Sequence, residues 1–206
     1  MKTKISFSTT IYDPILGSAL LPLRKSIART LSKNKNARIL DLCCGTGAQL
    51  RYLEKEGYIN LHGLDLDPGM IAYAKECSQS IKFYEGDASK THFDDGAFDS
   101  VIISLAIHDK DQALRESILK EAVRLISKHG AIYIADFAFD KKSTRWGRFL
   151  ISLVEFFAGD EHYSNFKKYT KIGGMPNVLA QEKLKMLEVD RALHDAIAVW
   201  KLTRIT

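Results

Sequence analysis

The chain has 206 residues, 46% of them hydrophobic, and a formal net charge of +5 at pH 7, as expected for one folded domain of ordinary size. Its apolar runs are all shorter than the roughly 20 residues of a membrane-spanning helix, so no such helix is expected. Asp13, Pro14 and Pro22 interrupt the apolar stretch near the start, so a secretory signal is not expected.

The cysteines and the charge distribution indicate the cellular compartment and the kinds of surface that the protein could approach. The three cysteines, Cys43, Cys44 and Cys77, show no CxxC spacing, and we interpret them as reduced thiols of a cytoplasmic protein. The net charge is +7 over residues 1–38, −6 over 39–136 and +4 over 137–206. Basic flanks of this kind indicate either an approach to an anionic surface, membrane or nucleic acid, or simply a solvated basic face.

The first predicted element is a helix over residues 12–32, within an N-terminal helical segment 8–34. Asp13 can cap it, and Pro14 suits the first helical position. Strands and helices then alternate, which favours a doubly wound parallel sheet. The predicted strands are 38–42, 61–65, 81–86, 98–106 and 131–137, and the predicted helices between them are 47–56, one opening at Asp67–Pro68, and 110–127.

The C-terminal third departs from this alternation. An apolar stretch, 145–158, is followed by a polar segment that includes HYSNF, which we interpret as a loop, and by a predicted helix over 176–184. Two late strands, 186–193 and 195–204, are close enough in sequence to form a hairpin.

The most informative segment is RILDLCCGTGAQ, residues 38–49. Asp41 lies at the carboxyl end of the first strand, where open α/β sheets bind ligands. Gly45 and Gly47 allow close approach of the backbone to a ligand. A nicotinamide dinucleotide site is the alternative, but that fingerprint needs a third glycine where this chain has Leu50, and Asp41 would repel a pyrophosphate.

The segment resembles the first motif of the class I S-adenosylmethionine-dependent methyltransferases, whose loop wraps the methionine part of the cofactor. The resemblance implies a Rossmann-like sheet of seven strands, the last antiparallel, with helices on both faces. It implies one methyltransferase domain over 1–206, with a lid-like insertion at 139–175. The cofactor would be S-adenosylmethionine and its product S-adenosylhomocysteine; no metal site is expected.

The family's pattern assigns further cofactor contacts. Asp65 would accept hydrogen bonds from the ribose hydroxyls, Asp87 from the adenine amino group, and Tyr12 would place its ring over the sulfonium. Asp65 and Asp87 each have an alternative role in a helix cap or turn. The implied cofactor-binding residues are Tyr12, Asp41, Cys43, Gly45, Gly47, Asp65, Leu66, Met70, Asp87, Ala88, Ser104 and Leu105.

The sequence also bears on the subfamily. The position after the fourth strand reads SLAIHD, without the prolines of DNA adenine methyltransferases, and a paired-Glu loop of arginine methyltransferases is absent there. Asp109 and Asp136 are weakly spaced for a divalent cation. Residues 115–137 are similar to ubiquinone/menaquinone C-methyltransferases and bacterial phospholipid N-methyltransferases, although Lys128-His129-Gly130 replaces their usual Pro-Gly-Gly turn.

The expected function is therefore methyl transfer to a small or lipid-like, largely hydrophobic acceptor. His108 and His162 are candidate general bases, with a pocket wall and a loop contact as their alternatives. The segment 145–158 would act as a lid, or else as a core helix or dimer contact. Trp146, Tyr163 and Asn165 are the expected substrate contacts. Peripheral membrane contact is an open possibility, and the oligomeric state stays open. The alternatives are a non-catalytic cofactor-binding regulator and a nucleic-acid methyltransferase, the latter disfavoured.

Overall fold

The computed structural model describes residues 19–157, 160–179 and 184–205. Tyr12 and the first part of the predicted helix 12–32 lie outside these residues. The described part of that helix is α2, Leu21–Thr30, which buries Leu23 and Ile27.

Seven strands form one sheet in the order β3-β2-β1-β4-β5-β7-β6. β1 to β5 pair in parallel, whereas β7 runs antiparallel to both β5 and β6. This arrangement confirms the predicted doubly wound sheet with its antiparallel last strand. The strands are β1 Ile39–Leu42, β2 Leu61–Asp65, β3 Lys82–Glu85, β4 Phe98–Ser104, β5 Ile126–Phe137, β6 Leu184–Ala192 and β7 Ile197–Arg204.

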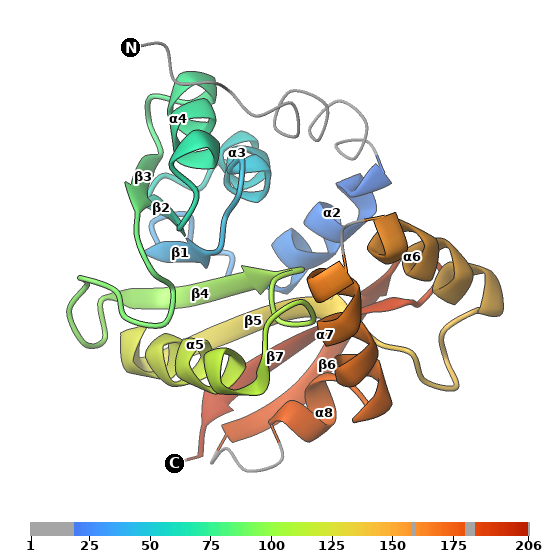
Figure 1. The fold of residues 1–206 in the computed structure, drawn as a ribbon. Helices are drawn as coiled ribbons and strands as arrows, with labels where there is room; N and C mark the ends of the chain where they lie inside the picture. The colour runs from blue at the N-terminus through green and yellow to red at the C-terminus, as the bar shows by residue number, and fades with distance from the viewer. Residues whose placement is uncertain (1–18, 158–159, 180–183, 206) are drawn as a thin grey trace.

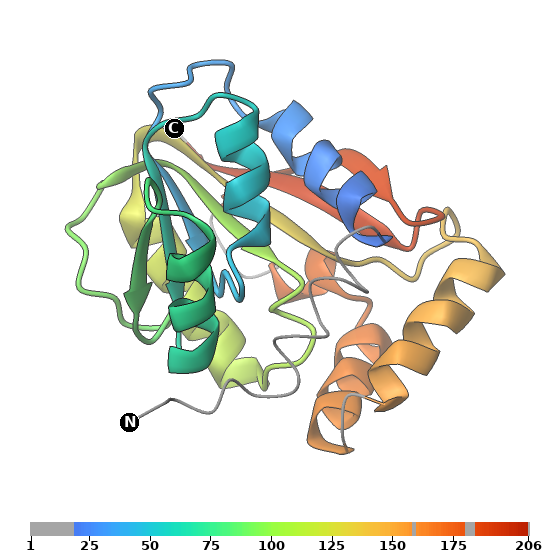
Figure 2. The same cartoon turned by 90° about the horizontal axis from the view of Figure 1, so that it is seen from above.

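Helices cover both faces of the sheet. α2, α3 and α4 lie on one face and α5 on the other (Figures 1 and 2). β1 is buried along its whole length because parallel strands are covered on both sides. The helices after α2 are α3 Ala48–Lys55, α4 Pro68–Cys77, α5 Gln112–Leu125, α6 Arg145–Phe157, α7 Asp160–Lys171 and α8 Met175–Val178.

Local sequence explains where the helices on the sheet begin. Asp67 accepts hydrogen bonds from the backbone N–H groups of Gly69 and Met70, and Pro68 follows it, as predicted. Asp111 caps α5 in the same way, accepting from the N–H of Leu114 at 2.9 Å.

Three predictions for the C-terminal half are wrong in detail. β5 begins at Ile126, directly after α5, so residues 128–130 belong to the strand and not to a turn before it. Of the predicted helix 176–184, the described residues form α8, Met175–Val178, and β6 already includes Leu184, while residues 180–183 lie outside the described structure. The segment containing HYSNF is helical, forming part of α7. Tyr163, Phe166 and Tyr169 recur there at a spacing of three residues, which is the helical signal that the polar composition concealed.

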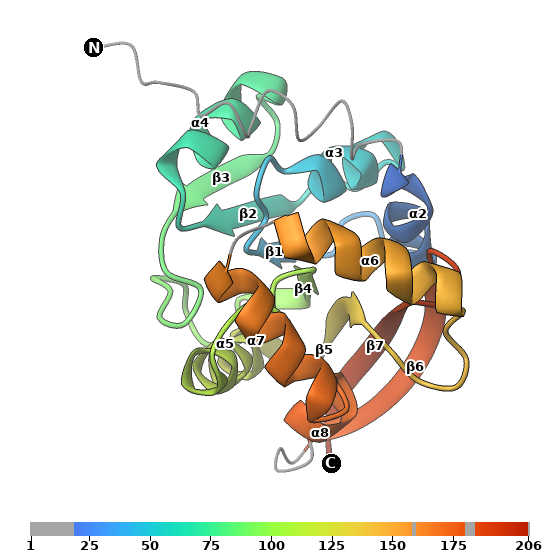
Figure 3. The same cartoon turned by 45° about the vertical axis from the view of Figure 1, so that its right-hand side comes forward.

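α6 and α7 lie in front of the carboxyl ends of β1, β4 and β5 (Figure 3). α7 is fixed by the hydroxyl of Tyr169, which is fully buried and donates to the carbonyl of Phe137 at 3.0 Å. α6 begins against the β6–β7 turn: a Cβ at Gly147 would lie 3.1 Å from Cβ of Ala196 and 3.2 Å from that of His194. Within the part of the chain that the structure describes, no helix is both long and apolar enough to cross a membrane.

Candidate active site

The loop after β1 has the backbone that a bound ligand requires. Gly45 and Gly47 have φ angles of 53° and 73°, and Cys43 adopts the same left-handed conformation at 61°. A Cβ at Gly47 would lie 2.6 Å from the Phe83 ring, so only glycine fits there, whereas a Cβ at Gly45 would have no neighbour within 4 Å. Gly47 thus serves packing, and Gly45 faces open space that a ligand can occupy.

Asp41 is the buried acid of this loop. Its side chain is almost fully buried, and its Oδ1 has no hydrogen-bond partner among the described residues. Burial, and secondly the charge of Asp65, raise the pKa of Asp41 from 3.8 to about 8. A buried polar atom without a partner is costly, so this geometry suits a ligand that donates to the carboxylate.

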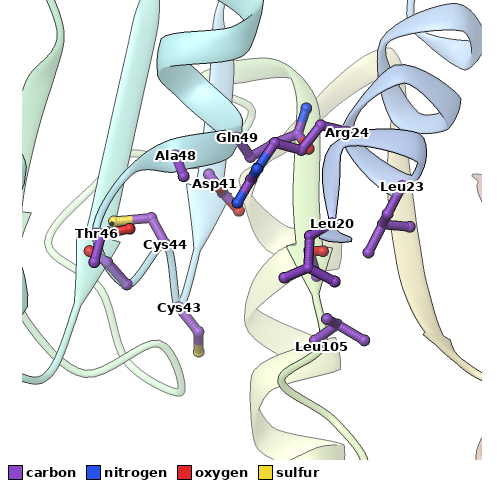
Figure 4. Close-up of a pocket in the computed structure, with 12 residues that line it drawn as sticks. Leu20, Leu23, Arg24, Asp41, Cys43, Cys44, Thr46, Ala48, Gln49 and Leu105 are labelled. Carbon is purple, nitrogen blue, oxygen red and sulfur yellow. Dashed lines mark hydrogen bonds between the residues drawn. The ribbon is translucent and has the colours of Figure 1, made fainter. Parts of the chain in front are cut away.

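A cavity of about 150 Å³ lies against Asp41, between α2, the loop after β1 and the end of β4. Figure 4 shows the Arg24 side chain extending from α2 toward Asp41 and Gln49. The amide nitrogen Nε2 of Gln49 is buried and, in the described structure, also lacks a partner. The lining residues are Leu20, Leu23, Arg24, Asp41, Cys43, Cys44, Gly45, Thr46, Ala48, Gln49, Ser104 and Leu105.

The structure therefore brings together five of the residues expected to bind the cofactor: Asp41, Cys43, Gly45, Ser104 and Leu105. It adds residues that sequence reasoning missed. Leu23 and Arg24 come from α2, and Leu20 is the residue directly before it. The three residues recur at helical spacings of three and four, so the helical periodicity carried the signal for them. Thr46 and Gln49 belong to the motif itself.

Asp65 connects β2 to the loop. Its Oδ2 accepts the N–H of Gly45 at 2.7 Å, and its Oδ1 accepts the N–H of Asp67 at 3.0 Å. Each carboxylate oxygen has a second lone pair, so both can still accept a hydrogen bond from a ligand. The contact with Gly45 also fixes the loop that borders the cavity.

The remaining expected adenine contacts lie after β2 and β3. Leu66 is 71% exposed, Met70 is half-buried and Ala88 is buried. Asp87 is exposed, and its Oδ1 accepts from the N–H and the hydroxyl of Ser89 at 2.8 and 2.7 Å. Such exposure is compatible with a surface that a nucleoside covers, and these roles stay predictions.

His108 and Asp136 form a buried pair at the carboxyl ends of β4 and β5. His108 is 3% exposed and Asp136 is fully buried, with Nδ1 of the histidine 2.7 Å from Oδ1 of the aspartate. Leu105, which begins the turn toward His108, has φ of 54°, an unusual value for a bulky residue. Strained backbone of this kind marks a turn that the surrounding structure fixes.

Arg115 and Asn165 attach α7 to this turn. The Arg115 guanidinium donates to the carbonyls of Ile107 and His108, at 2.8 and 3.0 Å, and to that of Asn165 at 3.2 Å. The amide of Asn165 donates to the carbonyl of Asp109 at 3.0 Å. The expected substrate contact Asn165 thus lies beside the expected base His108.

The other expected acceptor residues lie on α6 and α7. Trp146 and Phe149 are 61% and 55% exposed and stack with ring centroids 5.7 Å apart. Tyr163 is half-buried and stacks on Phe166. His162 lies within α7, but its side chain is outside the described structure. No cluster of three His, Cys, Asp or Glu side chains in the described residues could hold a metal ion, and Asp136 is occupied by His108.

Comparison with known proteins shows what the chain is similar to. Residues 39–130 match the family described as "Methyltransferase domain". A demethylmenaquinone methyltransferase from Beutenbergia cavernae is 30% identical over 115 residues, which cover 56% of this chain and 47% of that protein. The ubiquinone/menaquinone biosynthesis C-methyltransferase UbiE from Campylobacter jejuni is 25% identical over 142 residues, covering 65% and 58%. The chain spans about half the length of the curated relatives it matches.

A solved structure gives the same fold. The S-adenosylmethionine-dependent methyltransferase from Aquifex aeolicus is similar over 98% of this chain and 99% of its own, with a TM-score of 0.69 and 16% identity. The sequence match contains the loop after β1, Asp65 and His108, and the structural likeness extends over the sheet and its helices. Residues 39–130 therefore match a methyltransferase domain, and the chain has the fold of the Aquifex aeolicus S-adenosylmethionine-dependent methyltransferase.

Proposed function

We propose that this protein transfers a methyl group from S-adenosylmethionine to a small or lipid-like, largely hydrophobic acceptor. The observation that supports the donor is that two buried polar atoms beside Gly45, Asp41 Oδ1 and Gln49 Nε2, have no hydrogen-bond partner among the described residues. The named activities of the quinone methyltransferases from Beutenbergia and Campylobacter support the acceptor class.

The residues of the cavity fit the amino-acid end of the donor. The Asp41 carboxylate suits the donor's ammonium group, and Arg24 and the Gln49 amide suit its carboxylate. Asp65 would accept hydrogen bonds from the ribose hydroxyls. Asp87 would accept a hydrogen bond from the adenine amino group, and the backbone N–H of Ala88 would donate one to a nitrogen of the adenine ring. Leu66, Met70, Ser104 and Leu105 would provide the walls. When bound, the sulfonium supplies an activated methyl group, so no covalent protein intermediate is needed.

The protein's own contribution is to align the acceptor, exclude water and accept a proton. His108, beside the turn after β4, is the base that the described geometry supports, and His162 on α7 is the second candidate. Trp146, Tyr163 and Asn165 would contact the acceptor, and α6 would act as the lid. The burial of Cys43 and then the charge of Asp65 raise the pKa of the Cys43 thiol to about 12, so we assign it no nucleophilic role.

Calorimetry tests the donor. S-adenosylmethionine and S-adenosylhomocysteine should both bind, and NAD should show no comparable affinity. Binding of NAD without S-adenosylhomocysteine would overturn the proposal. Binding of the donor without turnover of any hydrophobic or nucleic-acid acceptor would favour a non-catalytic regulator.

The acceptor class is tested by mass spectrometry of ligands that copurify with the protein, followed by turnover of donor labelled in its methyl group. Demethylated quinols and small phenols should accept the label. If these acceptors remain unlabelled and DNA or RNA accepts the label, the nucleic-acid alternative is favoured.

We propose further that the start of α6 touches a membrane surface. The exposed rings of Trp146 and Phe149 stand beside the exposed cations Lys141 and Arg145, a combination that suits an anionic lipid interface. Replacing both rings by alanine should reduce cosedimentation with anionic vesicles. The matched control replaces Ile59 and Leu187, which are as exposed but lie elsewhere. Equal sedimentation of both double variants would contradict the contact.

A further inference from the structure

Asp136 has no role in the function proposed above, yet it is the most completely hydrogen-bonded acid at the carboxyl ends of the strands. Its Oδ2 accepts the backbone N–H groups of Ile107 and His108, at 3.0 and 3.1 Å. Its Oδ1 accepts the N–H of Phe137 at 2.8 Å and lies 2.7 Å from Nδ1 of His108. Four groups thus converge on one fully buried carboxyl.

We propose that Asp136 is a positioning residue that holds His108 as its Nδ1–H tautomer, so that proton transfer from the acceptor takes place at Nε2. The positioning of the ring by Asp136 is argued only from the contacts observed in this structure. Its use in proton transfer rests on the proposed function.

The hydrogen-bond network assigns the tautomer. Three of the four groups around Asp136 are backbone N–H groups, which can only donate, so they require acceptor lone pairs on both oxygens. A carboxylate accepts all four contacts when Nδ1 of the ring carries the one hydrogen between the two side chains. We therefore assign Asp136 as a carboxylate that accepts from the Nδ1–H group of His108. In this tautomer Nε2 is the ring nitrogen that can accept a proton.

The contacts around the ring preserve this orientation. The Phe137 ring lies 4.5 Å from the His108 ring between centroids, and the rings of Phe166 and Tyr169 approach edge-on at 6.2 and 6.4 Å. Arg115 holds the carbonyl of His108 from the other side. The backbone and the ring are thus fixed separately, which limits rotation of the imidazole about its own bonds.

The proton balance is simple. A hydroxyl or acidic carbon of the acceptor loses its proton to Nε2, and the electron pair that is left becomes the nucleophile for the methyl group. The imidazolium formed on His108 is stabilised by the Asp136 carboxylate 2.7 Å away, and it returns its proton to water after release of the product.

A purely structural tie is the competing explanation, since the two contacts to Ile107 and His108 N–H groups would alone connect β5 to the turn after β4. A structural role of this kind would be served equally well by either tautomer of the His108 ring. The two explanations are therefore separated by a measurement on the imidazole and not by loss of stability.

Nitrogen NMR on the full chain with isotope-labelled histidine makes this measurement. The His108→Gln variant assigns the His108 signals by their disappearance. The wild-type ring should show a protonated Nδ1 and an unprotonated Nε2, and Asp136→Asn, which presents an amide N–H₂ to Nδ1, should reverse the two. A wild-type ring protonated at Nε2, or an unchanged tautomer in Asp136→Asn, would overturn the proposal. The wild-type spectrum decides alone if the variant does not fold.

Turnover then tests the use of the pair. Asp136→Asn should lower the methyl-transfer rate about 10²–10⁴-fold while donor affinity measured by calorimetry is kept. A reversed tautomer with full activity would overturn the proton-transfer role. If no acceptor is methylated by the wild-type protein, the proposed function fails, whereas the tautomer result still decides whether Asp136 positions His108.

Discussion

The proposed donor side and the proposed acceptor side of the site meet at the carboxyl ends of β1 and β4, but they differ in how their buried polar groups are paired. On the donor side, Asp41 Oδ1 and Gln49 Nε2 are buried without partners among the described residues. On the acceptor side, His108, Asp136 and Arg115 are buried and bonded to one another or to the backbone. We expect a ligand to complete the first side, whereas the polar groups of the second already have partners in the protein.

The difference has an energetic meaning. Unpartnered buried groups cost stability in the free protein, and a ligand that pairs with them recovers that cost as binding energy. A bonded network gains nothing of this kind, but it holds side chains within the narrow limits that proton transfer requires. We therefore expect substitutions on the donor side to change affinity and those on the acceptor side to change rate.

The largest expected effect is on the acceptor side. His108→Gln should lower the rate of methyl transfer about 10²–10⁴-fold, because a general base is lost, with donor affinity nearly unchanged. His162→Gln is the matched variant from α7, and the histidine whose loss has the smaller effect is not the base. Full activity in both variants, measured by initial rates with saturating donor, would show that transfer proceeds by positioning alone.

The next effect concerns the charge of Asp41. Its pKa is raised from 3.8 to about 8 in the protein without ligand, so the carboxyl is protonated at neutral pH, whereas the donor's ammonium favours the ionised form. Donor binding should release a proton, and affinity should fall about tenfold for each pH unit below the raised pKa. Calorimetry in buffers of different ionisation enthalpy would measure both, and Asp41→Asn should bind more weakly with no pH dependence.

The same shift has a consequence for stability. A carboxyl with a raised pKa in the folded state contributes stability that is present below its unfolded pKa and is lost as pH rises through the folded value. The free protein should therefore lose stability between about pH 4 and pH 8 from this group, and Asp41→Asn should remove that part of the slope. Donor affinity that does not change with pH would contradict the assignment of Asp41 to the ammonium.

A smaller effect is expected at the end of β2. Asp65→Ala removes the hydrogen-bond acceptor for the ribose and the contact with the Gly45 N–H. The variant should therefore bind S-adenosylmethionine and S-adenosylhomocysteine about tenfold more weakly, or weaker still. Asp67→Ala is the control, because Asp67 caps α4 and its loss should cost about 1 kcal/mol of stability without changing affinity. Equal affinities in the two variants would leave Asp65 as part of the turn only.

The two sides also differ in how far the sequence alone predicted them. The loop from Asp41 to Gly47, with Asp65 at the next strand end, is local in sequence, and the sheet order that brings them together follows from strand alternation. Leu20, Leu23 and Arg24 required knowledge of how α2 packs, because periodicity gives a face but not its neighbour.

On the acceptor side, the decisive contacts join residues that are distant in the chain. Asp136 and His108 are 28 residues apart, and Arg115 and Asn165 are 50 apart. For Asp136 the sequence suggests only a weakly spaced metal ligand, because an aspartate at a strand end gives no local sign of its partner. The sequence predicts a loop where α7 forms for a similar reason: the aromatic face of this helix is stabilised by tertiary contacts such as that of Tyr169 with Phe137.

The smallest expected effect is a difference in hydrogen exchange between α6 and α7, the two helices that cover the site. α7 is tied to the turn after β4 and to β5 by Asn165, Arg115 and Tyr169, whereas α6 has its described anchor at Gly147 and at the contact of the Thr144 N–H with the His194 carbonyl, at 3.2 Å. A lid must open to admit the acceptor, so its hydrogen bonds should break more readily than those of its anchored neighbour.

Hydrogen exchange measured by mass spectrometry should therefore be faster over residues 145–157 than over 163–171 in the free protein, by about tenfold for the 1.4 kcal/mol that one hydrogen bond is worth. Product and an acceptor analogue should slow exchange in α6 and leave α7 nearly unchanged. Slow exchange in α6 of the free monomer would contradict the lid role of this helix. Protection that rises with protein concentration would indicate a dimer contact instead. If anionic vesicles alone slow exchange around Trp146, the lid opens toward the membrane, and the acceptor reaches the site from the lipid.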